Sequence, residues 1–404
     1  MMKRSIFVCL VLLLLSLCLQ AGAELVSNAT PAPTPELTVA PGDHSELDAF
    51  VAKAFKQKHA AGGAVMVAKD GQLVYEYYYG YQNTKTKVPI TRYSYFRVAS
   101  VTKMISAIGI MTLVEQGKLD LDTDLSEYYG YTIRNPKYKD TPITLRMVMS
   151  HTSSFYDGGG MSSGKTSLQY LIDYANRRSS NFLSKKPGTY YRYSNLNGGI
   201  LGSLMELVSN ESINTYMTEH VFQPLGVNCA YNVNFISDTE NCCDTYNAKG
   251  VIMQGVAYMQ RQPYEDTVNP DKHFRITVGS VWARPIDLLR IGMMLEQEGT
   301  LDGVTILQPE TVREMMMDQN GTGGITISSA YGLNINRMTN LVDGMVIYGH
   351  QGLNGGILAN VYFEPENNLV FILCSNGCNT NMNDHIAAVS RKIFNKVWAE
   401  FVGE

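Results

Sequence analysis

Hydrophobic residues near the start of the chain recur at helical spacing, and two strand-like runs follow them. The helical segment begins at Ser45, and its apolar side chains fall on one face: Leu47, Phe50, Val51, Ala54 and Phe55. Residues 64–68 and 73–79 are rich in apolar and aromatic side chains. Asp70-Gly71 lies between these runs and favours a tight turn. We therefore expect a helix followed by a two-stranded hairpin.

A similar pattern returns near the end of the chain. Strand-like runs cover residues 345–348, 356–364 and 369–375, and apolar residues at helical spacing predict a final helix from about Asp384. The stretch of roughly 120–300 is mixed helix and loop. We therefore expect an α/β (α+β) fold class, with an antiparallel sheet flanked by N- and C-terminal helices and an inserted mainly helical domain.

The first residues of the chain have the pattern of a secretory signal peptide, which we assign to residues 1–23. Lys3 and Arg4 precede an almost wholly apolar run, and Ala21-Gly22-Ala23 offers a cleavage site. A Pro/Ala/Thr-rich linker at 24–44 would then lead to a single domain at 45–402. These features predict a secreted, periplasmic or cell-envelope protein with no stable membrane span after signal cleavage, since the apolar run is short for a span.

Charge and cysteine content narrow the classes of function. The chain has 404 residues and a formal net charge of −4, which gives no indication of a nucleic-acid partner. Signal removal would leave five cysteines, at positions 229, 242, 243, 374 and 378. In an exported protein, a disulfide between Cys229 and either Cys242 or Cys243 is plausible, and the odd count leaves at least one thiol unpaired or intermolecular.

Ser100 and Lys103 are the first candidates for chemistry, because they stand three residues apart where a helix is expected to begin. That spacing puts both side chains on one helical face, with Cβ atoms roughly 5–6 Å apart. A serine is a weak nucleophile until a base accepts its proton, and a desolvated lysine can act as that base. Taken alone, the pair is better explained as a helix cap followed by a solvated lysine.

Two later segments could supply the remaining parts of a catalytic centre. Tyr193 and Asn195 lie in Tyr-Ser-Asn before an apolar helix; a tyrosine in a cationic pocket can hold a lowered pKa and exchange protons. His350-Gln351-Gly352 follows the expected strand 345–348, so Gly352 would leave room for a substrate along the strand. The backbone N–H of Leu353 could join that of Ser100 as an oxyanion pair. The alternatives are a core tyrosine and a surface histidine in a glycine-rich loop.

Together these segments resemble the three ordered motifs of the serine β-lactamase / penicillin-binding protein superfamily. The resemblance is greatest to the class C β-lactamase-related branch, which includes D-alanyl-D-alanine carboxypeptidases, D-aminopeptidases and esterases. Residues 150–154, Ser-His-Thr-Ser-Ser, are similar to that family's His-Thr-Ser-Gly loop, and 224–227 to its Pro-Leu-Gly-Met turn. The resemblance covers about residues 45 to 400. It implies a β-lactamase/transpeptidase-like fold.

The resemblance also implies a covalent acyl-enzyme mechanism without a cofactor or metal. Ser100 would attack a carbonyl, Lys103 and Tyr193 would handle its proton, and Asn195, His350, Gly352 and Leu353 would bind the substrate or its oxyanion. The implied partner is a small-molecule or peptide substrate, with peptidoglycan as one candidate. A D-amino-acid peptide of the cell wall is the first expectation, with a β-lactam or short-chain ester as alternatives. The alternative outside the enzymes is a penicillin-binding sensor or a peptidoglycan-binding protein.

One departure from the family pattern bears on the substrate. The family's third motif usually carries a threonine that helps to bind a substrate carboxylate, and Gln351 stands there, with apolar Leu353 beyond it. The chain therefore lacks the hydroxyl that usually binds a substrate carboxylate at this position.

Two competing motifs are weaker. Residues 159–166 fit a phosphate loop and 160–164 fit G-x-S-x-G, but both patterns need a buried strand before them, and 151–158 has loop composition. The histidines show no zinc-type spacing.

Overall fold

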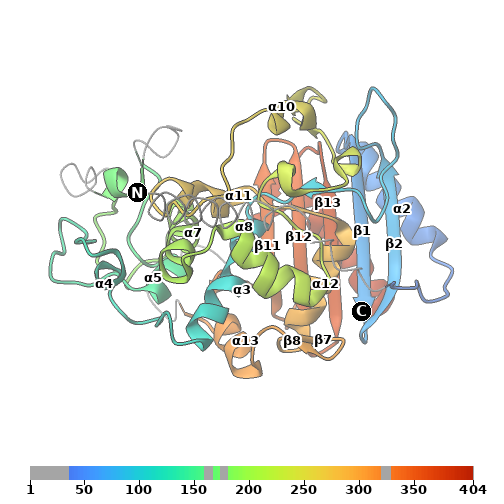
Figure 1. Cartoon of the computed structure of the whole chain (residues 1–404). Helices are drawn as coiled ribbons and strands as arrows, with labels where there is room; N and C mark the ends of the chain where they lie inside the picture. The colour runs from blue at the N-terminus through green and yellow to red at the C-terminus, as the bar shows by residue number, and fades with distance from the viewer. Residues whose placement is uncertain (1–35, 159–166, 173–180, 320–328, 404) are drawn as a thin grey trace, which may run out of the picture.

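The computed structural model describes residues 36–158, 167–172, 181–319 and 329–403. A seven-stranded antiparallel sheet dominates it, in the order β2-β1-β13-β12-β11-β10-β9. The strands, in that order, are Gln72–Gly80, Gly62–Lys69, Leu369–Ser375, Ile357–Glu364, Ile347–Asn354, Asn336–Met338 and Ser329–Tyr331. The sheet therefore joins both ends of the described chain, as the hydrophobic pattern predicts (Figure 1).

Helices cover both faces of the sheet. Along β1, Ala64 and Met66 pack in one apolar layer, whereas Val65 and Val67 pack in the other, as expected for side chains that alternate along a strand. The layer of Val65 and Val67 is completed by α2 (Ser45–Gln57) and α14 (Ala388–Phe401). The opposite layer is completed by α12 (Pro285–Glu296) and by α3 (Val101–Glu115), which lie in front of the sheet in Figure 1.

The inserted region is mainly helical and is built around α3, of which 13 of 15 residues are buried. The α3 helix contacts both α7 and strand β11, so it links the helical region to the sheet. The other helices here are α4 (Leu125–Tyr129), α5 (Leu145–Met149), α7 (Asn195–Ser209), α8 (Ile213–Met217), α9 (Gln223–Leu225), α10 (Val256–Gln260) and α11 (Ile276–Gly279), and α13 (Pro309–Met316) follows this region. The α12 helix lies within the expected 120–300 insertion but packs on the sheet.

Short elements complete the described chain. A π-helical turn forms η1 (Thr218–Phe222). Three 3₁₀ turns form η2 (Val233–Phe235), η3 (Thr239–Asn241) and η4 (His273–Arg275). The two-stranded pairs are β3 (Phe96–Arg97) with β6 (Trp282–Ala283), β4 (Thr245–Tyr246) with β5 (Ile252–Gln254), β7 (Thr300–Leu301) with β8 (Val304–Thr305), and β14 (Met382–Asn383) with β15 (Ile386–Ala387).

Three local expectations were wrong. The His350 motif lies inside β11 rather than after a strand, because pairing with β12 continues to Asn354. The final helix begins at Ala388, since Asp384 and His385 have φ of 47° and 64° and form the turn of the β14–β15 hairpin. Both changes place structured backbone where a loop or helix start was expected.

The third correction concerns the thiols. All five cysteines outside the expected signal peptide are free and buried, so the suggested pairing of Cys229 is not formed. The expected signal peptide, most of the linker and the 159–166 motif lie outside the described residues. Within the described ranges, no helix combines the length and apolar character required to cross a membrane.

Candidate functional site

Ser100 and Lys103 meet at the N-terminus of α3, as their spacing predicts. The Nζ atom of Lys103 lies 3.0 Å from Oγ of Ser100 and donates a hydrogen bond of 2.6 Å to the carbonyl oxygen of Val278. Ser100 precedes the first residue of α3, and Ala99 before it has a φ of 45°. Such a left-handed residue is strained, and residues of this kind also occur in turns, but strained residues cluster at active sites. The backbone therefore presents the Ser100 hydroxyl to Lys103.

Lys103 is fully buried, and burial changes its protonation. Loss of hydration disfavours the ammonium form and lowers the pKa of Lys103 to about 7, although the nearby negative charge of Asp157 partly opposes this change. The lysine stem passes close to Gly198 of α7, where an added Cβ would lie 2.6 Å from Cε of Lys103. Close approach of α7 therefore encloses the amine and keeps a substantial fraction of it neutral near pH 7.

Tyr193 lies beside this pair, but its ionisation differs from the sequence-based expectation. Its ring centroid is 5.3 Å from Nζ of Lys103. Burial raises the pKa of Tyr193, and this outweighs the lowering effect of nearby Ser100, although the two hydroxyl groups do not meet the geometry of a formed hydrogen bond. The expectation of a lowered tyrosine pKa was therefore wrong. The structure provides a neutral phenol, which can donate a proton but is a poor base.

His350 is a buried, neutral imidazole and not a surface residue. Its Nδ1 lies 2.8 Å from the carbonyl oxygen of Gln351, which can only accept, so Nδ1 carries the proton. Its Nε2 then accepts from the Tyr331 hydroxyl at 3.2 Å. Burial first, and the charge of Lys103 second, lower the pKa of His350 to about 3. His350 therefore adds no positive charge to the site at neutral pH.

His151 is a further residue of the site that the sequence-based assignment left out. Its ring packs on Tyr193 with centroids 4.4 Å apart, and its Nδ1 lies 3.0 Å from the side-chain amide of Asn197 and 3.3 Å from the backbone N of Ser194. Because a backbone N–H can only donate, Nδ1 is the accepting nitrogen. Burial and the Lys103 charge hold the pKa of His151 well below its ordinary value. Its position in the Ser-His-Thr-Ser-Ser segment was the available sequence signal.

Asn195 lies at the site, but a carboxylate unnoticed in the sequence controls its orientation. Asp157 accepts hydrogen bonds from the Asn195 side-chain amide and backbone N, both at 2.9 Å. It also accepts from the Ser194 hydroxyl at 2.7 Å and from the Leu196 backbone N at 3.1 Å. Asp157 thus caps α7 from a distant loop. A helix N-terminus carries partial positive charge and therefore stabilises a carboxylate placed there. Local sequence around Asn195 gives no signal for this partner.

Gly352 permits close packing of β11 against the start of α3. A Cβ at this position would lie 2.0 Å from the carbonyl oxygen of Val98 and 3.0 Å from the backbone N of Ser100. The space that Gly352 leaves is therefore occupied by backbone and is not open to a substrate. Strand β10 pairs with β11 only as far as Gly349, so the same edge of β11 continues past Ser100 without a β10 partner. Leu353 lies on this segment, where its N–H could complete an oxyanion pair with that of Ser100.

A cavity of about 420 Å³ opens beside Ser100. Its lining combines polar and apolar side chains: Ser100, Tyr191, Tyr193, Asn195, Asn336, Met338, Asn340, His350, Gln351, Leu353, Tyr362, Met382, Asp384, His385 and Ile386. Among these described residues none is lysine or arginine. A volume of this size suits a small ligand, and mixed walls are typical of such sites.

The β14–β15 hairpin forms one end of this cavity, and Gln351 holds it in place. The Gln351 side chain accepts from the backbone N of Ala387 at 2.8 Å and donates to the carbonyl oxygen of His385 at 3.3 Å. Asn340 binds Asp384 from the other side. The residue at the family's carboxylate-reading position therefore has a positioning role here, as it orients the hairpin.

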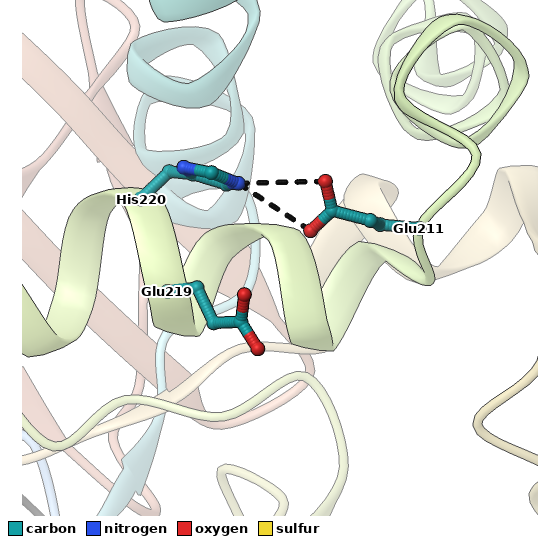
Figure 2. A group of neighbouring side chains, drawn as sticks. All are labelled: Glu211, Glu219 and His220. Carbon is teal, nitrogen blue, oxygen red and sulfur yellow. Dashed lines mark hydrogen bonds and ion pairs between the residues drawn. The ribbon is translucent and has the colours of Figure 1, made fainter. Parts of the chain in front are cut away.

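A separate group of possible metal ligands lies on η1 and in the loop before α8. Figure 2 shows Glu211, Glu219 and His220, with both oxygens of Glu211 facing the His220 ring. The nitrogen–oxygen distance of 3.4 Å is that of a loose ion pair, and both partners are partly exposed. Neither this group nor its neighbours line the Ser100 cavity. We assign it no role in the site.

The fold and the Ser100–Lys103 centre define a protein of the serine-nucleophile class that shares the penicillin-recognising architecture. The chain belongs to the Beta-lactamase family, because the sequence model of that family matches residues 47–395. This membership confirms the resemblance and fold class that the three motifs imply.

Individual relatives are more distant. Over 196 residues the chain is 29% identical to esterase EstB from Burkholderia gladioli, covering 45% of this chain and 50% of that protein. The chain spans about a third of the length of other curated relatives that it matches, for example 36% of protein flp from Staphylococcus aureus (strain MW2).

Solved structures agree on the fold over most of the chain. The octameric penicillin-binding protein homologue from Pyrococcus abyssi aligns with a TM-score of 0.71 and 20% identity, covering 90% of this chain and 78% of that one. D-amino acid amidase from Ochrobactrum anthropi SV3 aligns with a TM-score of 0.67 and 17% identity, covering 88% and 99%.

Proposed function

We propose that this protein is a serine hydrolase that cleaves small amides or esters through an acyl-enzyme on Ser100. The observation that carries the proposal is the 3.0 Å contact between the Ser100 hydroxyl and a buried lysine amine. A lysine with a pKa of about 7 is a competent base near neutral pH.

The reaction follows from the groups in place. Neutral Lys103 accepts the proton of Ser100 as Oγ attacks the carbonyl carbon, and backbone N–H groups at Ser100 and Leu353 bind the oxyanion. The neutral phenol of Tyr193 gives its proton to the leaving group and recovers one from the Lys103 ammonium. A water molecule then attacks the acyl ester while neutral Lys103 takes its proton, and the Lys103 ammonium returns that proton to Oγ as the ester bond to Ser100 breaks.

The cavity favours substrates without a carboxylate next to the reacting carbonyl. Its described lining contains Asp384 and no lysine or arginine, and His350 is neutral. A substrate carboxylate would there lose hydration without gaining a charged partner, which is unfavourable. An uncharged ester or amide therefore fits better than a terminal D-alanyl-D-alanine or penicillin. The carboxypeptidase expectation stays a prediction, as do secretion and action on peptidoglycan.

The direct test is covalent labelling of Ser100. Wild-type protein and Ser100→Ala are incubated with a fluorophosphonate probe and analysed by intact mass. We expect one probe per wild-type chain and none on Ser100→Ala, with melting temperature as the check that the variant folds. Equal labelling of both proteins would refute the assignment of the nucleophile.

A comparison of substrates then separates the classes. Hydrolysis of a short-chain nitrophenyl ester, nitrocefin and a D-Ala-D-Ala peptide is measured under the same conditions. We expect the uncharged ester to have the highest kcat/KM. A higher value for either carboxylate-bearing substrate would contradict the substrate argument while leaving the nucleophile intact.

A further inference from the structure

A second cavity, of about 380 Å³, lies behind the segment that carries Tyr193. Its described lining is Tyr156, Leu183, Ser184, Lys185, Tyr190 and Arg192. Tyr191 and Tyr193 line the Ser100 cavity. Tyr190 and Arg192, which alternate with them along the chain, line the second cavity. Such alternation is the pattern of an extended segment, so residues 190–193 form a wall between the two cavities.

Hydrogen bonds to one central segment hold the walls of the second cavity in place. The backbone N of Arg192 donates to the carbonyl oxygen of His151 at 2.9 Å, and that of Leu183 donates to the carbonyl oxygen of Ser154 at 2.8 Å. The side chain of buried Asn135 donates to the carbonyl oxygen of Leu183 at 2.8 Å. The two segments that line the cavity from residues 183–185 and 190–192 are therefore both fixed to residues 151–154.

The polar side chains of the second cavity suit an anion. Lys185 and Arg192 can only donate hydrogen bonds, and within the described ranges neither forms an ion pair. The Ser184 hydroxyl accepts from Nζ of Lys137 at 2.8 Å, so its own proton remains available to a ligand and a third cation lies nearby. No carboxylate is part of the described lining.

Aromatic rings hold both cations of the lining in place. The Cζ atom of Arg192 lies 5.7 Å from the ring centroid of Tyr156, and Nζ of Lys185 lies 5.2 Å from that of Tyr190. These are distances at which a ring attracts a cation. A ligand would therefore meet side chains that are already oriented, which reduces the entropy lost on binding.

We propose that this cavity is a second binding site, which takes a small ligand bearing a carboxylate or phosphate group. Lys185 and Arg192 would bind the acidic group through charge-assisted hydrogen bonds. The hydroxyl groups of Ser184, Tyr156 and Tyr190 would bind hydroxyl groups on the rest of the ligand. A sugar acid or a sugar phosphate combines these two features and suits a cavity of this size.

The two neighbouring cavities differ in charge. The described lining of the Ser100 cavity has Asp384 and no lysine or arginine, whereas that of the second cavity has two cations and no carboxylate. An acidic group is therefore stabilised in the second cavity and disfavoured in the first. This inference does not rest on the proposed function, because binding there requires no reaction at Ser100.

Isothermal titration calorimetry of the whole protein with glucuronate, glucose 6-phosphate and glucose tests the site at pH 7.5. We expect at least one of the two acidic sugars to bind with a Kd at least about tenfold below that of glucose, as one charge-assisted hydrogen bond provides. Stronger binding of glucuronate would identify a carboxylate ligand, and stronger binding of glucose 6-phosphate would identify a phosphate ligand. Equal binding of all three sugars, or no binding, would refute the proposal.

Three variants identify the residues responsible, with melting temperature as the check on folding. Arg192→Gln and Lys185→Gln should each raise the Kd of the acidic sugar about tenfold or more. Lys186→Gln is the matched control, because it makes the same change of charge at an exposed neighbour that does not line the cavity. Its Kd should stay within about twofold of the wild type. Equal losses in Lys185→Gln and Lys186→Gln would indicate general attraction by positive charge and would refute a defined site.

A fourth variant separates this site from the catalytic one. Ser100→Ala should bind the acidic sugar with an unchanged Kd, because Ser100 does not line the second cavity. Loss of binding in Ser100→Ala would place the ligand beside Ser100 and would refute the second site. A failure of the fluorophosphonate to label Ser100 would refute the proposed function and would leave the result of the calorimetry unaffected.

Discussion

The burial of Lys103 leads to a quantitative prediction about pH. An ordinary lysine has a pKa of 10.5, whereas that of Lys103 is lowered to about 7, a difference of about 3.5. At pH 7 the neutral fraction therefore rises from roughly one in three thousand to about one half, a gain of about 10³ in available base. This lies within the range of about 10² to 10⁴ that general base catalysis contributes.

The assay is kcat/KM for a neutral ester between pH 5 and 9, which reports ionisations of the free protein. Because the base must be neutral, we expect activity to fall about tenfold per pH unit below 7 and to level off above it. His350, with its pKa of about 3, and Tyr193, with its raised pKa, do not titrate in this window. A flat profile, or activity that still rises about tenfold per pH unit up to pH 9, would refute the assignment of Lys103 as a base with a lowered pKa.

The same lowered pKa predicts the stability of Lys103→Met. The unfolded chain binds more protons than the folded one between pH 7 and 10.5, so stability rises with pH across this window, and the cost of the buried lysine is complete below pH 7. The cost of burying the lysine is at most about 5 kcal/mol. Lys103→Met removes this cost, but it also removes the hydrogen bond to the Val278 carbonyl, which reduces the gain in stability by about 1–3 kcal/mol.

Lys103→Met should therefore be inactive yet more stable by about 2–4 kcal/mol at pH 7, with less benefit at pH 10. Urea unfolding at both pH values measures the difference. An equal gain in stability at the two pH values would contradict the proposed dependence of stability on the protonation of Lys103.

Two further substitutions test the packing of the site. Gly198→Ala adds a Cβ that would lie 2.6 Å from Cε of Lys103, so the amine must shift, and we expect kcat to fall at least about tenfold with little change in urea midpoint. Gln351→Ala removes two hydrogen bonds to the hairpin, so we expect KM for a long-chain ester to rise several-fold while Ser100 labelling by a small probe is retained. Unchanged kcat in the first case, or unchanged KM in the second, would contradict these roles.

The sequence predicted the parts of the fold and site that depend on local spacing. Apolar periodicity located α2, β1, β2 and β13, and the three-residue interval of Ser100 and Lys103 was sufficient because one helical turn brings them together. Sequence reasoning missed Asp157 because its partners at the start of α7 are 37 to 39 residues away. It gave the wrong direction for the pKa of Tyr193 because burial cannot be read from a local motif.

Strand β11 was cut short for a related reason. Glycines at positions 349, 352, 355 and 356 weaken a strand pattern, so the segment has loop composition. In the structure Gly352 is required by the close approach of Val98 and Ser100, a contact between segments about 250 residues apart. The composition that suggested a loop is therefore the composition that lets a strand lie against the nucleophile.

The site is held in a conformation that its own residues do not favour. Ala99, His151 and Ser154 have φ of 45°, 57° and 70°, and each such residue costs about 1–3 kcal/mol. Lys103 adds the cost of a buried amine. The strain is tolerated because the two apolar layers on either side of the sheet fix the surrounding backbone. It follows that substitutions which relax the site should stabilise the fold and abolish the chemistry, whereas truncations in either layer should destabilise the fold and lose activity only through unfolding.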